Sequence, residues 1–239
     1  MAIDHAMFDL AETTGALLWR LYQWEPWCLS FGRHEPAARR YDRTRIANLG
    51  LDCVRRPTGG RAVWHARELT YAVAGPTDRL GSLRDAYRTI HQLLARAVTR
   101  LGLTTTLAPS RTTPGLGSGA CFAVPVGGEL TVGAKKILGS AQRRGTRALL
   151  QHGSLLLEDD QSLLRSVQLG PVTNTGPAET TLTALLGRPV GFGEAAEAIR
   201  WALEAESVSA LAAEGPNEVL RRATTHYDTY RSEAMTWER

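Results

Sequence analysis

The sequence of 239 residues has little cysteine and no long apolar run. Its three cysteines, Cys28, Cys53 and Cys121, are odd in number, widely spaced and without a CxxC pair, which argues against a disulfide framework or a zinc knuckle. No apolar stretch reaches the roughly 18–20 residues that cross a bilayer. The N-terminus carries acids early and no basic segment before an apolar stretch, unlike a signal peptide. We therefore expect a soluble, cytoplasmic protein with free thiols and no membrane partner.

Lysine is nearly absent as well. Of 28 basic residues only Lys135 and Lys136 are lysine, which leaves 26 arginines. Arginine serves wherever a positive charge is enough, whereas a titratable amine or a compact ammonium requires lysine. The net charge of +4 suits acidic partners. The chain shows no nucleic-acid-binding motif and no regular interleaving of aromatic and basic residues, so we expect no nucleic-acid partner.

The composition, 43% hydrophobic and 22% charged, is that of a globular protein with a sizeable core. Neither an internal repeat nor a long linker divides the chain, and we expect one α+β domain over residues 1–239, with helices flanking a mainly antiparallel sheet. Helices are predicted at 2–12, 36–50, 83–102, 194–206 and 217–230, the last with Leu220, Ala223, Tyr227 and Tyr230 on one face. Ser82 and Asp85 form a candidate capping box.

Strands are predicted wherever apolar or alternating runs end at turn residues. They cover residues 16–24, 27–33, 52–56, 61–65, 68–75, 120–124, 129–133, 135–142 and 148–157. A hairpin is expected to turn at Gly133-Ala134. Segments 108–119 and 170–180 are predicted loops.

Three segments could carry chemistry: RRPTGGRAVWH (55–65), GACFAV (119–124), and KKILGSAQ with LLQHGSLLL within 135–157. Alone, Gly59-Gly60 reads as a turn, and His152 as either a core histidine or a catalyst. The small residues of GSAQ and HGS would let a backbone pass close to a ligand.

Together these segments resemble the family of lipoate ligases, octanoyltransferases and biotin ligases. MAIDHAM is similar to its first helix, RRPTGGRAVWHARELTYAV to its signature loop, and KKILGSAQRR…LLQHGSLLLE to its lysine strand and the strand beside it. YRSEAMTWER is similar to the end of the domain. The resemblance implies a biotin/lipoate protein ligase-type catalytic domain with a mixed or antiparallel sheet around a narrow acyl tunnel. It also implies a set of substrate-binding residues: Arg56, Thr58, Gly59, Gly60, Arg61, His65, Gly139, Ser140, Ala141, His152 and Gly153.

Two details distinguish branches of this family. Ligases that use ATP typically have a third glycine in the signature and an aspartate after its histidine, where this sequence has Arg61 and Ala66. Cys121 followed by Phe122, ahead of the lysine strand, is similar to the octanoyltransferases of the Gram-positive type. That likeness implies transfer of an octanoyl group from octanoyl-acyl carrier protein to a lysine of a lipoyl domain or of glycine cleavage H protein. It implies a monomer without a cofactor or metal.

The chemistry fits covalent catalysis at Cys121 and Lys136. A carrier thioester is already activated, so a Cys121 thiolate can take the acyl group and an acceptor amine can then remove it. By resemblance Lys136 is the motif lysine, which would favour the thiolate and relay a proton. Lys135 would point to the opposite face of the strand. The alternatives are an ATP-dependent lipoate-protein ligase, an amidotransferase that moves lipoyl or octanoyl groups between proteins, and a non-catalytic acyl-chain or carrier-protein binder. The presence of both Cys121 and Lys136 argues against the last.

Overall fold

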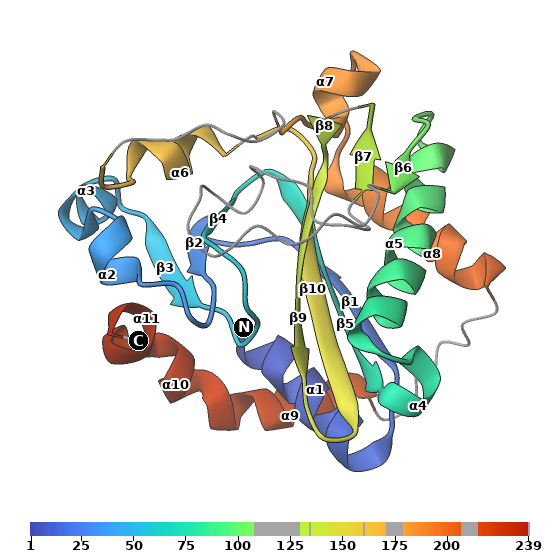
Figure 1. Cartoon of the computed structure of the whole chain (residues 1–239), viewed down its shortest axis with the longest axis horizontal. Helices are drawn as coiled ribbons and strands as arrows, with labels where there is room; N and C mark the ends of the chain where they lie inside the picture. The colour runs from blue at the N-terminus through green and yellow to red at the C-terminus, as the bar shows by residue number, and fades with distance from the viewer. Residues whose placement is uncertain (108–129, 134, 160, 171–178, 207–214, 239) are drawn as a thin grey trace.

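The computed structural model describes residues 1–107, 130–133, 135–159, 161–170, 179–206 and 215–238. Its centre is a four-stranded antiparallel sheet in the order β1-β5-β10-β9, which runs through the middle of Figure 1. The four strands are β1 (Leu18–Tyr22), β5 (Glu68–Pro76), β10 (Ala148–Leu156) and β9 (Leu138–Arg144). Strands β5 and β10 are buried along their whole length.

Helices cover both faces of this sheet (Figure 1). Helix α1 (Ala2–Thr14) packs with α9 (Gly215–Ala223) against one face, and α5 (Leu83–Arg100) with α8 (Phe192–Ala205) covers the other. Along β5, Ala72 and Ala74 pack toward α1, whereas Tyr71 and Val73 belong to the cluster around α5. This alternation follows from the two-residue period of a strand. It places one hydrophobic core on each face of this sheet.

Two smaller sheets complete the strands among the described residues. In the first, β2 (Cys28–Phe31) pairs in parallel with β3 (Asp52–Arg55) and antiparallel with β4 (Val63–His65). In the second, β7 (Leu130–Val132) lies between β6 (Thr106–Leu107) and β8 (Lys135–Lys136), all antiparallel. The predicted α+β class with a mixed or antiparallel arrangement is thus confirmed, although the described strands form three sheets rather than one.

The predicted hairpin is confirmed, but the predicted strand 135–142 is split. Thr131 pairs with Lys136 and Val132 with Lys135 across a turn in which Gly133 has φ 59°. The turn partner Ala134 lies outside the described residues. At Ile137 the chain changes partners: its N–H donates to Leu130 at 3.4 Å, and its carbonyl accepts from Leu156 at 3.0 Å. The lysine pair and the segment that follows it therefore belong to different sheets.

The predicted helix 36–50 is also interrupted, into α2 (Ala37–Arg40) and α3 (Arg43–Asn48). Between them Tyr41 is extended and forms a β-bridge with Gln168. Its hydroxyl donates to Glu35 at 3.0 Å, and its ring stacks on Phe31 with centroids 5.1 Å apart. These tertiary contacts outweigh the helical preference of the local sequence.

At the C-terminal end, the predicted helix 217–230 is α9, a 3₁₀ turn η1 (Thr224–His226) and α10 (Tyr227–Arg231), followed by α11 (Glu233–Trp237). Val219 and Ala223 are buried, whereas Leu220 and Tyr227 are exposed, so the predicted apolar face is wrong. The 3₁₀ turn changes the rotation per residue, and residues before and after it no longer share a face.

The remaining described helices are short or behave as predicted. The capping box is confirmed, because Ser82 and Asp85 exchange hydrogen bonds at the start of α5. Three short helices lie at connections: α4 (Thr77–Leu80), α6 (Ser162–Ser166) and α7 (Leu182–Leu186). None of the helices in the described part of the chain combines the length and the apolar character needed to span a bilayer.

Candidate active site

The small residues of β9 and β10 lie opposite one another and form one wall of a pocket. Gly139 pairs with Ser154, Ser140 with Gly153, and Ala141 with His152. The pocket, of about 20 Å³, brings together residues from distant segments: Tyr22, Trp24, Arg56, Val63, His65, Thr70, Gly139, Ser140, Ala141, His152, Gly153 and Ser154. Seven of the predicted substrate-binding residues are among them: Arg56, His65, Gly139, Ser140, Ala141, His152 and Gly153.

Gly153 is required by its protein neighbours. A Cβ at this position would lie 2.4 Å from the Gly139 carbonyl oxygen, 2.6 Å from Ser140 Oγ and 2.7 Å from the Tyr71 ring. No real side chain tolerates such distances, because backbone atoms cannot move aside. Close packing of β9, β10 and β5 is thus sufficient to explain the glycine at position 153. From the sequence alone, this glycine was expected to let the backbone pass close to a ligand.

A buried relay links His152 to the signature loop. Asp4 on α1 lies 3.0 Å from His152 Nδ1, and Thr58 Oγ1 lies 2.5 Å from His152 Nε2. The carboxylate can only accept, so Nδ1 carries the proton and Nε2 accepts from the Thr58 hydroxyl. The Asp4 carboxylate also accepts from Arg20 at 2.7 Å and from Tyr22 at 2.9 Å. This relay holds the loop at Thr58 against strand β10.

The electrostatics of this relay favour a charged carboxylate and a neutral imidazole. Burial alone would raise the pKa of Asp4, but the hydrogen bond from His152 and the positive charges of the N-terminal amine and Arg20 hold it well below its usual range. Burial lowers the pKa of His152, against the opposing influence of Asp4. At neutral pH the relay therefore carries one negative charge, matched by Arg20.

A second relay of the same composition surrounds His65. Its Nδ1 lies 2.6 Å from Glu68 Oε1, and its Nε2 lies 2.5 Å from Ser30 Oγ. Glu68 Oε1 also accepts from Thr70 at 2.5 Å and from Ser154 at 2.8 Å. The indole of Trp24 stacks on the His65 ring with centroids 4.4 Å apart. His65 is thus held in one orientation at the pocket wall.

Arg56 organises the signature loop from within. Its Nη1 donates to the Ser30 carbonyl at 2.8 Å and to the Ser30 hydroxyl at 2.7 Å. Its Nη2 donates to the carbonyls of Gly59 at 3.1 Å and Arg61 at 2.6 Å. Gly60 has φ 87°, and its carbonyl packs so tightly on Gly32 that a Cβ there would lie 1.8 Å away. Residues 58–61 are not among those that line the pocket.

One atom of that loop is left unsatisfied. Arg61 Nη1 is buried and has no hydrogen-bond partner among the described residues. A buried guanidinium N–H without a partner favours an acceptor group from beyond the described residues. Arg61 stands where the ligases that use ATP typically have glycine, so this donor is a feature of the present sequence.

The structure adds a polar group that the sequence patterns did not identify. The Tyr71 hydroxyl lies 2.7 Å from Ser140 Oγ and accepts from Gln151 at 2.8 Å, while His91 Nε2 lies 2.9 Å from Ser140 Oγ. Burial raises the pKa of Tyr71 well above its usual range. The signal in the sequence was weak: His91 interrupts the apolar face of α5, and Gln151 interrupts an apolar strand. This network orients the hydroxyl of Ser140, a residue that also lines the pocket.

The two lysines differ as the strand alternation predicts. Lys136 is 0% exposed, whereas Lys135 is exposed. The backbone of Lys136 is fixed by a bridge to Glu179 and by a hydrogen bond from Thr180 at 3.0 Å. Lys136 is not among the residues that line the pocket. Cys121 and Phe122 lie outside the described residues, so the pairing of Cys121 with Lys136 stays a prediction.

The other two cysteines are poor nucleophiles. Burial raises the pKa of the Cys28 thiol well above its usual range, and burial together with Asp52 raises the pKa of the Cys53 thiol to about 12. A thiol with such a pKa holds its proton at neutral pH and reacts slowly.

The fold is that of lipoate-protein ligase-type catalytic domains. The solved structure described as "Crystal structure of lipoate-protein ligase A bound with ATP" covers 99% of this chain, and this chain 92% of it, with a TM-score of 0.81 and 21% identity. A bi-partite lipoate protein ligase and its E2 lipoyl domain from Thermoplasma acidophilum superposes with a TM-score of 0.78 and 20% identity, covering 99% of this chain and 89% of that one.

The chain belongs to the lipoyl protein ligase A/B catalytic domain family, whose model matches residues 1–204. Among curated relatives, Octanoyltransferase LipM of Symbiobacterium thermophilum is 37% identical over 216 residues, covering 83% of this chain and 78% of the relative. The family predicted from the signature loop and the lysine strand is thereby confirmed.

Proposed function

We propose that this protein transfers an octanoyl group from octanoyl-acyl carrier protein to a lysine of a lipoyl domain or of glycine cleavage H protein. The likeness to an octanoyltransferase over 83% of the chain carries the proposal. The departures at Arg61 and Ala66 from the pattern of ligases that use ATP support the transferase branch.

In the proposed reaction the Cys121 thiolate attacks the carbonyl carbon of the carrier thioester. The carrier thiol leaves with a proton, and the acyl group is held as an enzyme thioester. The acceptor lysine amine then attacks this thioester, an amide forms, and the Cys121 thiolate leaves while the amine loses a proton. Because the thioester is already activated, the reaction needs no nucleotide. The raised pKa values of Cys28 and Cys53 support Cys121 as the nucleophile.

Lys136 has the properties that this mechanism needs. It is fully buried, and a compact ammonium in a buried site favours a nearby thiolate and can relay the proton from the attacking amine. The small residues on β9 and β10 would then pass alongside the acyl chain, where each buried methylene contributes roughly 0.8 kcal/mol. Pocket length would set the preferred chain length.

The partners in this proposal are two small carrier domains met in turn. Carrier and lipoyl domains are usually acidic, and clusters of arginine at 39–45 and 143–147 offer complementary charge, whereas Arg55 and Arg56 of the cluster at 55–61 are buried and bonded within the protein. The Thermoplasma acidophilum neighbour is described together with its E2 lipoyl domain. The proposal includes a monomeric enzyme in the cytoplasm, where the thiol stays reduced.

An ATP-dependent lipoate ligase is the second candidate, favoured by the fold shared with a lipoate-protein ligase A bound with ATP. The two readings differ in their co-substrate. Turnover with octanoyl-acyl carrier protein and without ATP supports the transferase, and a strict ATP requirement supports the ligase. An amidotransferase would share the thioester mechanism and take its acyl group from a modified protein instead.

Intact-mass measurement after incubation with octanoyl-acyl carrier protein tests the acyl-enzyme. We expect one octanoyl adduct that hydroxylamine removes, absent in Cys121→Ala and present in Cys28→Ala and Cys53→Ala. Normal transfer by Cys121→Ala would overturn the proposed mechanism.

The lysine pair provides a matched control in the same transfer assay. Lys136→Arg keeps the charge but introduces a broad fork that stays protonated. We expect it to lose at least about 100-fold in transfer, the low end of the contribution of a positioned proton donor or acceptor. The exposed Lys135→Arg should be close to wild type. Equal activity of the two variants would remove Lys136 from the mechanism.

A further inference from the structure

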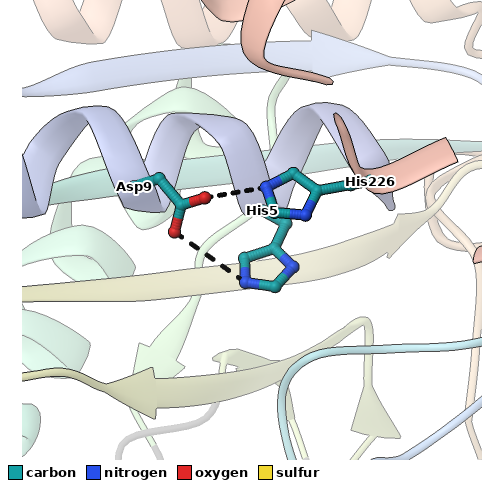
Figure 2. Close-up of side chains that lie close together, drawn as sticks. All are labelled: His5, Asp9 and His226. Atoms are coloured by element: carbon teal, nitrogen blue, oxygen red, sulfur yellow. Dashed lines mark hydrogen bonds and ion pairs between the residues drawn. The ribbon is translucent and has the colours of Figure 1, made fainter. Parts of the chain in front are cut away.

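A second group of titratable side chains lies apart from the pocket, between α1 and the C-terminal segment. His5 and Asp9 are one helical turn apart on α1, and His226 belongs to η1 (Figure 2). One ligand atom from each residue can be chosen so that the three atoms lie within 4.8 Å of one another. All three side chains are partly exposed, so the group is accessible from solvent.

Both imidazoles direct Nε2 at the same carboxylate. His226 Nε2 lies 2.7 Å from Asp9 Oδ2, and His5 Nε2 lies 3.9 Å from Asp9 Oδ1 (Figure 2). The two rings are stacked, with centroids 4.0 Å apart and planes inclined by 11°. Two imidazole nitrogens and one carboxylate, with two of the three on one helix at i and i+4, are a ligand set that first-row transition ions prefer.

The hydrogen-bond partners of His5 hold its ring in the tautomer with a lone pair on Nε2, which is the form that can bind a metal. Arg143 Nη1 lies 3.0 Å from His5 Nε2, and a guanidinium can only donate, so Nε2 holds a lone pair. The proton is then on Nδ1, 3.1 Å from the Tyr230 hydroxyl, which accepts it. An outer partner of this kind orients metal-bound histidines.

We propose that His5, Asp9 and His226 bind a divalent transition ion of the Zn²⁺ class, which fastens the C-terminal helices to α1. The ion would replace the proton that His226 Nε2 now donates to Asp9, and that proton would move to solvent or to Nδ1. In a tetrahedral site the ligand atoms lie roughly 3.3 Å apart, so the side chains must close slightly around the ion. The fourth position would hold water.

Arg143 is the built-in competitor for this site. Its guanidinium donates to the same His5 Nε2 that would bind the ion, and it places a positive charge beside it. It is also held over the Phe8 ring, 4.6 Å from the centroid, so it must swing away when the ion binds. The positive charge of Arg143 therefore lowers the affinity of the site for the ion, although Arg143 is not itself a ligand.

Zinc titration of the untagged full chain, stripped with EDTA and monitored with a competing chromogenic chelator, tests the proposal. We expect one equivalent to bind, and His226→Ala and Asp9→Asn each to weaken binding by at least about 100-fold, beyond the 10–100-fold typical of a lost outer partner. His34→Ala removes an exposed histidine far from the cluster in sequence and should bind like wild type. Unchanged binding in His226→Ala or Asp9→Asn would overturn the site.

The variant Arg143→Gln distinguishes a metal site from a cluster that only stabilises the fold. Removing the competing charge should tighten zinc binding by on the order of tenfold, as expected for one solvent-screened like charge. Zinc at 100 times its Kd should also raise the melting temperature of the wild-type chain, by about 5 °C or more, and not that of His226→Ala. No change in affinity in Arg143→Gln would contradict the proposed competition.

Cobalt distinguishes this site from the thiols. Co²⁺ bound to imidazole and carboxylate shows only weak visible bands, whereas thiolate ligation adds an intense near-ultraviolet band. A cobalt complex without that band, lost in His226→Ala, supports the site. A thiolate band at one equivalent would assign the ion to a cysteine and overturn the proposal.

Discussion

Helix α1 supplies the carboxylates of two histidine–carboxylate pairs that have the same chemistry and differ in burial. Asp4 lies 3.0 Å from His152 Nδ1, with side chains 0% and 4% exposed. Asp9 lies 2.7 Å from His226 Nε2, with side chains 37% and 17% exposed. The inner pair has every neighbour supplied by the protein and fixes the signature loop. The outer pair is open to solvent and can exchange a proton for an ion.

The geometry of a helix explains why one element carries both pairs. The two aspartates are five positions apart, and at 3.6 residues per turn they point roughly 140° apart around the axis. Asp4 faces the sheet, where water cannot solvate it, so its partners must be built in. Asp9 faces the gap toward η1. The two pairs have similar N···O distances, so burial is what separates the pair that positions a loop from the pair that we propose to bind an ion.

Asp4→Asn should have the largest effect on stability and should sharpen the contrast between the inner and the outer pair. The amide nitrogen replaces one acceptor with a donor, so it faces either Arg20, which donates to Oδ1, or Tyr22 and His152, which donate to Oδ2. The substitution also leaves the charge of Arg20 without its partner. We expect a loss of about 3–5 kcal/mol in the free energy of unfolding, as for other broken buried pairs. Chemical denaturation measures it. Asp9→Asn without metal should lose under about 1 kcal/mol, and equal losses in the two variants would break the comparison.

Thr58→Val tests the outer end of the inner relay. The substitution keeps the shape but leaves His152 Nε2 without a donor, and an unsatisfied buried acceptor costs about 1–3 kcal/mol. Thermal or urea unfolding reports this loss. Because Thr58 fixes the signature loop, the KM for the acyl donor should rise more than kcat falls, and Thr58→Ser should restore much of both. A wild-type melting curve for Thr58→Val would mean that the loop is held by Arg56 alone.

The outer cluster of His5, Asp9 and His226 is expected to make the stability of the protein depend on pH. The folded pKa of His5 is lowered from 6.5 to about 4. Between these values the unfolded chain takes up a proton that folded His5 does not, so stability should fall as the pH drops from about 6.5 to about 4. Above pH 6.5 both states are neutral at this site. Unfolding series with EDTA should show a shallower decline for His5→Gln than for wild type, and the same slope as wild type for His34→Gln.

Several elements could be predicted because their causes are local. The capping box at Ser82 and the apolar period of α5 need only neighbouring residues. The hairpin at Gly133 and the inward direction of Lys136 follow from a tight turn and strict alternation. The family likeness rested on short contiguous motifs and was confirmed for the same reason.

Other features depended on residues far apart in the chain. Tyr41 ends a helix because its ring and hydroxyl meet Phe31 and Glu35 in the folded core. The hydroxyl of Ser140 is oriented by Tyr71 and His91, which no spacing rule brings together.

The sequence alone determined which chemistry is available to this protein: a scarce lysine pair, a signature loop, and strands with small residues. The tertiary structure decided which side chains meet. His152 finds its carboxylate on the first helix and its hydroxyl on the signature loop, and His226 finds Asp9 near the opposite end of the chain. Local propensity acts over a few residues, whereas burial and pairing depend on the whole packed core, and this is why the relay and the outer cluster could be seen only in the folded molecule.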